Sequence, residues 1–175
     1  MRAADAVIRP VTADDLGDVA AIFGHYVTSS VVTFELTPPG VEHWRRLRDD
    51  LAARGLPFLV CERGGRVAGY AYAAPWRPKP AYRHTVESTI YLAPDHTGQG
   101  LGRELLGALL RHCAQAGVEQ VIAVIADSGI PASAALHRAC GFTEAGRLLG
   151  VGRKHGRRID TLLMQRDLTA PGGGT

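Results

Sequence analysis

The chain has 175 residues, of which 46% are hydrophobic and 21% are charged, and its formal net charge at pH 7 is +3. This composition is typical of a globular protein with a buried core, and it excludes disordered and fibrous chains. So small a positive excess gives no reason to expect a nucleic-acid partner. The N-terminal "MRAADAVIRP" contains no apolar signal-peptide core, and no run approaches about 18 apolar residues, so we expect neither secretion nor membrane insertion.

Three cysteines stand far apart in apolar stretches, at Cys61, Cys113 and Cys140. They form no Cys-x-x-Cys pair, and their odd number does not suit a disulfide framework. We therefore expect buried thiols in a reducing, cytoplasmic setting, and no cysteine nucleophile.

The N-terminal third predicts one strand and two helices. "AVIRP" (6–10) is strand-like, and "TADDLGDVAAIFGHYV" (12–27) has a plausible N-cap at Thr12 and apolar residues at helical spacing. A second amphipathic run follows Gly40 and stops at Gly55, which predicts another helix.

The middle of the chain predicts a hairpin, a strand and a helix. Two strand-like runs, 57–63 and 66–76, are joined by a Gly-Gly pair that tolerates the positive φ of a type I′ turn. Residues 84–94 are rich in β-branched side chains and predict a strand. Apolar side chains four positions apart predict a helix over 101–117.

The C-terminal part predicts a strand at 118–127, a short helix at 131–140 and strands at 141–152 and 158–168. About six or seven strands and four helices result, in α+β order and without an internal repeat. Since no linker is long enough to divide them, we expect one domain over residues 1–168 and a flexible tail at 169–175.

The segment "RKHGRR" (153–158) is the one cluster of basic residues. It suits either a phosphate clamp or a solvated hairpin turn, and the turn is the expectation because exposed charges are usually solvated.

A glycine-rich loop, "TGQGLG" (97–102), directly precedes the helix predicted at 101–117. Its glycines let backbone N–H groups approach a ligand, and a helix N-terminus favours negative charge, so the expected guest is a phosphate. The loop does not match the dinucleotide fingerprint, whose third glycine position falls on Arg103, and it lacks the lysine of a P-loop.

The run "YLAPDHTGQGLGRELLGALL" resembles the acyl-CoA-binding motif of the GNAT superfamily of N-acetyltransferases, whose loop reads Q/R-x-x-G-x-G/A. Gly100 and Gly102 match that pattern, and Thr97 replaces the leading Gln or Arg. A second segment, "IPASAALHRACGF", is similar to the family's N-x-x-S-x-x-L-Y-x-x-x-G-F, with Ile130 at the asparagine and His137 at the tyrosine position.

Further segments are similar to the phosphinothricin N-acetyltransferase group of that superfamily, namely "FGHYVTSSVVTFE", "AYAAPWRPKPAYRHTVESTIYLAP" and "GVGRKHGRRIDTLLMQRDL". Arg158 stands where that group usually carries tryptophan. The resemblance covers about residues 7–168 and implies the GNAT fold, with a central mixed, mostly antiparallel sheet flanked by helices. It also implies acetyl-CoA as co-substrate, no metal, and a homodimer.

For acetyl-CoA, the resemblance implies binding by the loop backbone and by Ser133. The expected contacts of the pyrophosphate are Thr97, Gly98, Gln99, Gly100, Leu101, Gly102 and Arg103. Ile90, Tyr91 and Leu92 would pair their backbone with the pantetheine and polarise the thioester carbonyl, although their side chains alone indicate only a core strand.

Glu87 stands in the middle of the strand-like run 84–94, where charged residues are disfavoured. The two-residue period of a strand puts it on one face with Thr89 and Tyr91. The residues alone fit a catalytic carboxylate and a salt-bridged or edge-strand glutamate equally well. The resemblance implies that Glu87 is the general base for the acceptor amine.

His137 occupies the position from which a tyrosine protonates the leaving thiolate in many relatives. An imidazole with a pKa of about 6.5 is able to do the same work. The alternative is a histidine that only packs or lies at the surface.

A basic, proline-stiffened loop, "WRPKPAYRH" (76–84), precedes the strand that carries Glu87. Its cations and aromatic rings suit a small anionic amino acid, and an ordinary basic surface loop is the alternative. The residues expected to bind the acceptor are Tyr72, Trp76, Arg77, Lys79, Tyr82 and Arg83, with Phe34 as a further candidate.

The sequence therefore predicts an acetyl-CoA-dependent N-acetyltransferase for the α-amino group of a small anionic amino acid, such as phosphinothricin, methionine sulfone or methionine sulfoximine. Transfer is expected to be direct, since no nucleophilic Ser or Cys constellation is apparent. Resistance to an antibiotic or herbicide and ordinary metabolism need the same pocket chemistry. The alternatives are acetylation of a protein N-terminus or a polyamine, and a non-catalytic acyl-CoA-binding regulatory domain.

Overall fold

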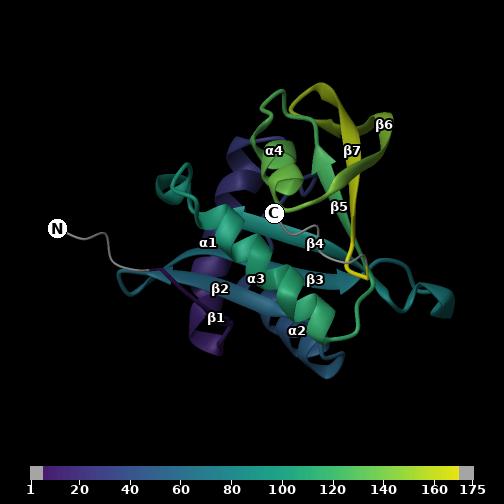
Figure 1. Cartoon of the computed structure of the whole chain (residues 1–175). Coiled ribbons are helices and arrows are strands. Elements are labelled where there is room, and N and C mark those ends of the chain that lie inside the picture. The colour runs from purple at the N-terminus through teal and green to yellow at the C-terminus, as the bar shows by residue number, and fades with distance from the viewer. Residues whose placement is uncertain (1–5, 170–175) are drawn as a thin grey trace.

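This computed structural model describes residues 6–169, which fold around one mixed sheet (Figure 1). Its seven strands lie in the order β1-β2-β3-β4-β5-β7-β6. The strands are β1 (Val7–Pro10), β2 (Phe58–Arg63), β3 (Arg66–Pro75), β4 (Thr85–Leu92), β5 (Gln120–Ala126), β6 (Thr143–Lys154) and β7 (Arg157–Asp167). The helices are α1 (Leu16–Ser29), α2 (Val41–Ala53), α3 (Leu101–Gln115) and α4 (Ala132–Ala139). The predicted order of strands and helices is confirmed.

Differences from the predicted boundaries are small and have local causes. The first helix begins at Leu16 because Ala13–Asp15 form a 3₁₀ turn, and Thr12 is the N-cap of that turn. Pro131 lies at the N-cap of α4 rather than inside its first turn. The predicted tail lies outside the described residues, except for Thr169.

Within residues 6–169, only one pair of neighbouring strands is parallel. β4 and β5 pair in parallel, and α3 provides the connection between them, whereas the other neighbouring strands pair antiparallel. This combination gives a mixed, mostly antiparallel sheet, as the resemblance implies. The parallel pair lies in the middle of the sheet, with α3 crossing over the strands in front of it (Figure 1).

The two faces of the sheet carry separate cores. On one face, α3 packs its buried leucines against small residues of β3, including Ala71 and Ala73. On the other face, α1 and α2, the latter with its buried Trp44, pack against Phe58 of β2 and Tyr70 of β3. Because successive side chains of a strand point to opposite faces, the buried apolar side chains of β3 and β4 divide between the two cores.

Two tight turns follow from their sequences. Gly64 and Gly65 both have positive φ, 59° and 76°, which confirms the predicted type I′ turn between β2 and β3. His155 and Gly156 do the same between β6 and β7, with φ of 49° and 71°. The predicted hairpin turn at "RKHGRR" is confirmed, but Lys154 is buried rather than solvated.

The cysteines lie mainly inside the fold. Cys61 and Cys113 are buried, as predicted, and Cys140 is only half-buried. Burial raises the pKa of the Cys113 thiol to about 12, and it also raises the pKa of the other two thiols. All three are therefore thiols at neutral pH.

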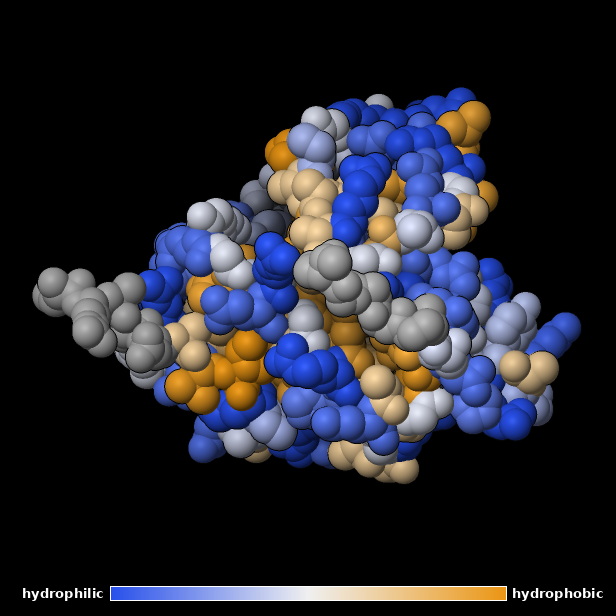
Figure 2. Space-filling model, viewed as in Figure 1, coloured by the Kyte–Doolittle hydropathy of each residue, from blue (hydrophilic) through white to orange (hydrophobic). Residues whose placement is uncertain are grey.

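The outer strand β6 turns one side to solvent and the other to the protein. Leu149 and Val151 are exposed. In Figure 2 the upper part of the surface is mainly hydrophilic, with separate hydrophobic groups at its edges. Gly152 and Lys154 are buried on the opposite side. Among the described residues, no helix has the length and apolar character needed to cross a bilayer.

An ion-pair network fixes the start of α1 against the edge of the sheet. Arg9 on β1 donates to both Asp15 carboxylate oxygens at 2.8 Å and to Glu62 on β2 at 2.8 Å. The Thr12 N–H also donates to Asp15, at 2.7 Å. These hydrogen bonds lower the pKa of the Asp15 carboxyl to about 2. The bond from Arg9 has the largest effect, and burial opposes the shift.

Replacing Asp15 tests how much this network stabilises the fold. A carboxyl pKa of about 2 in the folded state, against about 3.9 in an unfolded chain, corresponds to about 2–3 kcal/mol. Asp15→Asn should lower the free energy of unfolding by about that amount at pH 7 in urea titrations. Because the folded pKa is depressed, the difference should be full above about pH 4 and vanish as the pH falls through about 2.

The control is Asp50→Asn, which removes an exposed ion pair with Arg54 and should change stability little. Equal losses in the two variants, or a loss for Asp15→Asn that persists below pH 2, would contradict the assignment.

Candidate functional site

The central cavity opens where β4 and β5 separate. Their parallel ladder runs from Thr85↔Gln120 to Ser88↔Ala123 and ends there. β4 continues to Leu92 along β3, while β5 continues to Ala126 along β7. Each strand is held on its outer side, so the inner sides diverge and enclose a cavity of about 710 Å³.

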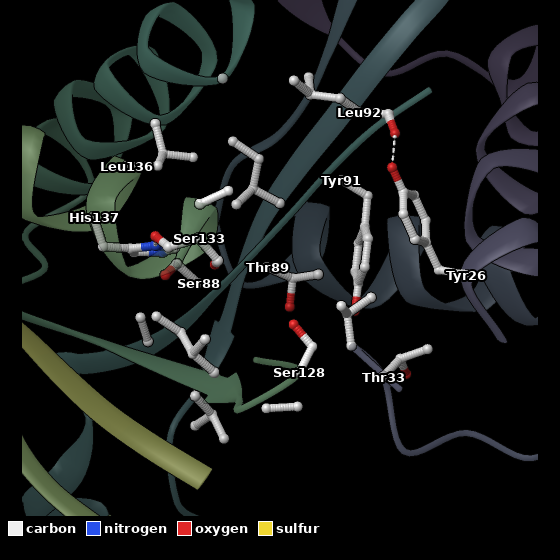
Figure 3. Close-up of a pocket in the computed structure, with 18 of the residues that line it drawn as sticks. Tyr26, Thr33, Ser88, Thr89, Tyr91, Leu92, Ser128, Ser133, Leu136 and His137 are labelled. Carbon is white, nitrogen blue, oxygen red and sulfur yellow. Dashed lines mark hydrogen bonds between the residues drawn. The ribbon is translucent and has the colours of Figure 1, made fainter. Parts of the chain in front are cut away.

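The backbone of Ile90 faces this gap. The hydrogen bonds at the two ends of β4 show which way its peptide groups point. The carbonyl oxygen of His84, just before β4, points to the β5 side and accepts a hydrogen bond there, whereas the N–H of Ala93, just after β4, points to the β3 side and donates to Ala68 O. Since successive peptide groups of a strand point to opposite sides, those of Ile90 and Leu92 point toward β5. Leu92 O accepts the Tyr26 hydroxyl at 2.6 Å, which is the dashed line in Figure 3. Ile90 keeps an N–H and a C=O without a ladder partner on β5.

Residues 97–103, including the start of α3, form the part of the cavity wall that we call the cradle. Gly98 and Gly100 have positive φ, 72° and 82°. A Cβ on Gly102 would lie 3.3 Å from Leu136 of α4, so a side chain there would crowd the helix. With the unpaired amides of a helix N-terminus and the guanidinium of Arg103, the cradle favours an anion.

The predicted cradle residues divide into two groups. Thr97, Gly98, Gly100, Gly102 and Arg103 line the cavity. The others do not, because the Leu101 side chain is buried in the core and the Gln99 side chain bonds to Arg63 and to Asp95 O. The Thr97 hydroxyl donates to Pro94 O at 3.0 Å, so it holds the loop rather than pointing at a ligand.

The α4 side of the cavity carries Ser133 and His137, both predicted as site residues (Figure 3). The His137 ring is 3% exposed and packs edge-on against Phe142 at 4.9 Å between centroids. Its Nδ1 lies 2.7 Å from Ser133 O. A carbonyl oxygen only accepts, so Nδ1 carries the proton and the neutral ring has a bare lone pair at Nε2. Burial lowers the His137 pKa, although the Ser133 contact opposes the shift.

The part of the cavity on the α1 and α2 face of the sheet, which we call the acceptor half, contains Glu87, Thr89 and Tyr91 on one face of β4, as strand alternation predicts. Tyr72 lies opposite Thr89 on β3. Among the described residues, the Glu87 carboxylate has no hydrogen bond and no ion pair, and burial raises its pKa. The two structural alternatives are wrong: Glu87 is not ion-paired, and β4 is a central strand.

The segment after α1 closes the acceptor half. Thr33, Phe34 and Glu35 line it, and Figure 3 shows the phenol end of Tyr91 directed toward the segment that carries Thr33. Phe34 and Tyr72 were predicted to bind the acceptor, and both lie here.

The predicted basic loop lies elsewhere. It leaves the far end of β3 and β4, as Figure 1 shows, and none of its five predicted residues lines the cavity. Arg77 instead packs over the ring of Trp76, 5.1 Å from its centroid, and Tyr82 is exposed. Within one chain, the structure therefore does not bring Trp76, Arg77, Lys79, Tyr82 and Arg83 to Glu87.

Several lining residues were not named as site residues from the sequence. Strand periodicity placed Thr89 on the face of Glu87, but no role was assigned to it. Tyr26, Ser128 and Thr161 also line the cavity, but they come from α1, the loop after β5 and β7. No local pattern marks these residues, because only the packing of distant elements brings them to β4.

Comparisons with known proteins identify the family and the fold. Residues 21–142 match the model of the acetyltransferase (GNAT) family. The chain is 48% identical over 163 residues to a phosphinothricin N-acetyltransferase of Alcaligenes faecalis, covering 93% of this chain and 83% of that protein. It is 37% identical over 164 residues to an L-methionine sulfoximine/L-methionine sulfone acetyltransferase of Pseudomonas aeruginosa, covering 93% and 95%.

A crystal structure of a GNAT superfamily phosphinothricin acetyltransferase from Sinorhizobium meliloti, in complex with acetyl-CoA, is also similar. It matches with a TM-score of 0.90 and 39% sequence identity, covering 97% of this chain and 92% of that one. The predicted fold is therefore confirmed.

The protonation state of His137 can be tested directly. Nitrogen-15 NMR of the histidine rings should show His137 as the neutral Nδ1–H tautomer, titrating below the ordinary value of about 6.5 because burial disfavours the cation. Loss of the signal in His137→Gln assigns it. A ring that is cationic at neutral pH, or that carries its proton on Nε2, would overturn this assignment.

Proposed function

This chain belongs to the GNAT family of acetyltransferases, and we propose that it transfers the acetyl group of acetyl-CoA to the α-amino group of a small amino acid. The expected acceptors are of the phosphinothricin, methionine sulfone and methionine sulfoximine type, on which similar proteins are named as acting. One observation carries the proposal. Glu87, a half-buried carboxylate without a partner among residues 6–169, shares a cavity with a glycine cradle at a helix N-terminus.

For acetyl-CoA, the cradle offers the site of the pyrophosphate, through the backbone of Gly98, Gly100 and Gly102 and the Arg103 guanidinium. The pantetheine would extend along β4 in place of the missing β5 ladder and pair with the backbone of Ile90. An N–H at the same strand edge would then bind the thioester oxygen and stabilise the developing oxyanion.

For the chemistry, Glu87 is proposed as the general base. An amine at neutral pH is mostly ammonium, so its proton must leave before the nitrogen lone pair attacks the thioester carbon. The C–N bond forms, the C–S bond breaks and coenzyme A leaves as a thiolate. Burial raises the Glu87 pKa toward the working pH, which makes its carboxylate a stronger base than an exposed one.

The predicted role of His137 needs a cationic ring. A neutral ring whose Nδ1–H is held by Ser133 O has no proton to give at Nε2. We therefore propose that the thiolate takes its proton from solvent or from the nitrogen of the new amide, and that His137 orders α4 beside the cofactor.

The charge of the acceptor half bears on the substrate. Glu35 and Glu87 line it, whereas the cationic Arg103 lies at the cradle. Two carboxylates suit the ammonium of an amino acid, and they equally suit a polyamine, which is the second candidate acceptor. Contact between the acceptor's anionic group and the basic loop would need a shift of that loop or a second copy of the chain, in line with the homodimer that the resemblance implies.

A panel of acceptors tests the proposal. Thiol release from acetyl-CoA should be fastest with phosphinothricin, methionine sulfone or methionine sulfoximine, and slow with spermidine and with a peptide. Mass spectrometry should find one acetyl group on the amine. Preference for spermidine would favour the polyamine alternative, and acetyl-CoA binding without any acetylated product would favour the non-catalytic one.

Replacing the proposed base tests the mechanism. Glu87→Gln should lower kcat by about a hundredfold or more while acetyl-CoA binding persists, because only proton removal is lost. In the wild type, kcat/KM should rise with pH through a pKa above the ordinary carboxylate value of about 4.3, since burial raises it. This rise of kcat/KM with pH should disappear in the Glu87→Gln variant.

The matched control is Glu144→Gln, an exposed glutamate on β6 that should leave kcat unchanged. A Glu87→Gln enzyme of normal rate, or one that keeps the wild-type pH limb, would exclude Glu87 as the base.

A further inference from the structure

We propose that Lys154 and Gly152 of β6 are positioning residues for the acceptor half of the cavity, because they hold residues 31–35 in the place where these form its wall. The kinetic part of this inference rests on the proposed function. β6 lies at the opposite edge of the sheet from β1, and only its inner side reaches this segment.

Lys154 contributes a buried cation. Its side chain comes from the strand end next to the β6–β7 turn, and the residue is 3% exposed. Its Nζ donates to Thr33 O at 2.9 Å, which joins residues 121 positions apart. Among the described residues, no carboxylate lies within ion-pair distance, and Glu35 contributes only a weaker attraction.

Burying an ammonium without an ion pair is costly, so its hydrogen bond to Thr33 O must supply much of the compensation. Burial accordingly lowers the Lys154 pKa. A lysine that merely solubilised the hairpin turn would point to water, as the neighbouring exposed Arg153 does.

Gly152 contributes space. A Cβ on this residue would lie 2.2 Å from the Cζ of Phe34 and within 2.7 Å of two further ring atoms. Its φ is not in the left-handed region, so the backbone alone does not require glycine. The ring of Phe34 occupies the place that any side chain at position 152 would fill.

The two contacts act on adjacent residues of the same wall. Thr33 and Phe34 line the acceptor half, together with Glu35, whose N–H donates to the Thr33 hydroxyl at 3.3 Å. The cradle begins α3, which packs on the opposite face of the sheet from Tyr72 and Tyr91. Loosening residues 31–35 should therefore affect the acceptor and leave acetyl-CoA unaffected.

Lys154→Met tests the cation, because it keeps an apolar stem of similar length and removes the donor. We expect KM for the acceptor to rise by about tenfold or more, since hydrogen bonds to charged groups have that weight, while KM for acetyl-CoA stays within about twofold. Hydrogen exchange of the amides in 31–35 should accelerate by a similar factor of about ten. Lys154→Arg, which keeps a charged donor, should restore part of both effects.

Arg153→Met is the matched control, since it removes one positive charge from the adjacent, exposed position. It should leave both KM values and the exchange rates unchanged. If Lys154→Met behaves like Arg153→Met in exchange, or raises both KM values equally, the positioning role is excluded.

Gly152→Ala tests the space, in a cycle with Phe34→Ala. Alone, Gly152→Ala should raise KM for the acceptor, because its methyl group displaces the ring. In the Phe34→Ala background it should add little, since the clashing atoms are gone, so the two effects should be strongly non-additive. Additive effects would overturn the packing argument.

The exchange measurements need no substrate, so they separate this inference from the proposed function. If the wild type acetylates no acceptor, but exchange in residues 31–35 is faster in Lys154→Met and not in Arg153→Met, the proposed function is refuted and the positioning role is supported. If the wild type is active and exchange in Lys154→Met equals that of the wild type, the proposed function is supported and the positioning role is refuted.

Discussion

The cavity depends on one constraint in the sheet, the short parallel ladder between β4 and β5. Four residue pairs join these strands, and beyond them β3 and β7 hold the strands on opposite sides. Because each strand stays paired along its outer edge, the gap remains open while the backbone of Ile90 keeps its extended form. The cradle, His137 and Glu87 all border this gap, so one feature of strand pairing creates both halves of the site.

Two charged groups at or behind the wall of the acceptor half, the half-buried Glu87 and the buried Lys154, lie in different environments. Lys154 has a carbonyl partner in Thr33 O, whereas the Glu87 carboxylate has no partner among the described residues. A charge that serves structure is compensated, because an unpaired one destabilises the fold. A carboxylate left without compensation has a raised pKa, and this is the property that a general base requires.

Local patterns predicted much of this site. The glycine loop directly before a helix, the face shared by Glu87, Thr89 and Tyr91, and the turn at "RKHGRR" all follow from neighbouring residues. The prediction was least successful for side-chain direction in loops. Gln99 turns away to Arg63, and the basic loop places its side chains outside the cavity, because no strand or helix period fixes which way a loop residue points.

The strands, the helices, their turns and the residue types that the chemistry needs could be predicted from the amino-acid sequence. These depend on propensities and periods within a few positions, which a single sequence displays. Which distant residues meet at the site depends on the packing of the whole fold. Tyr26 reaches Leu92 across 66 positions, and Lys154 reaches Thr33 across 121, because strand order and the packing of α1 bring them together. No local pattern encodes such contacts, so the wall of the acceptor half could be found only in the folded protein.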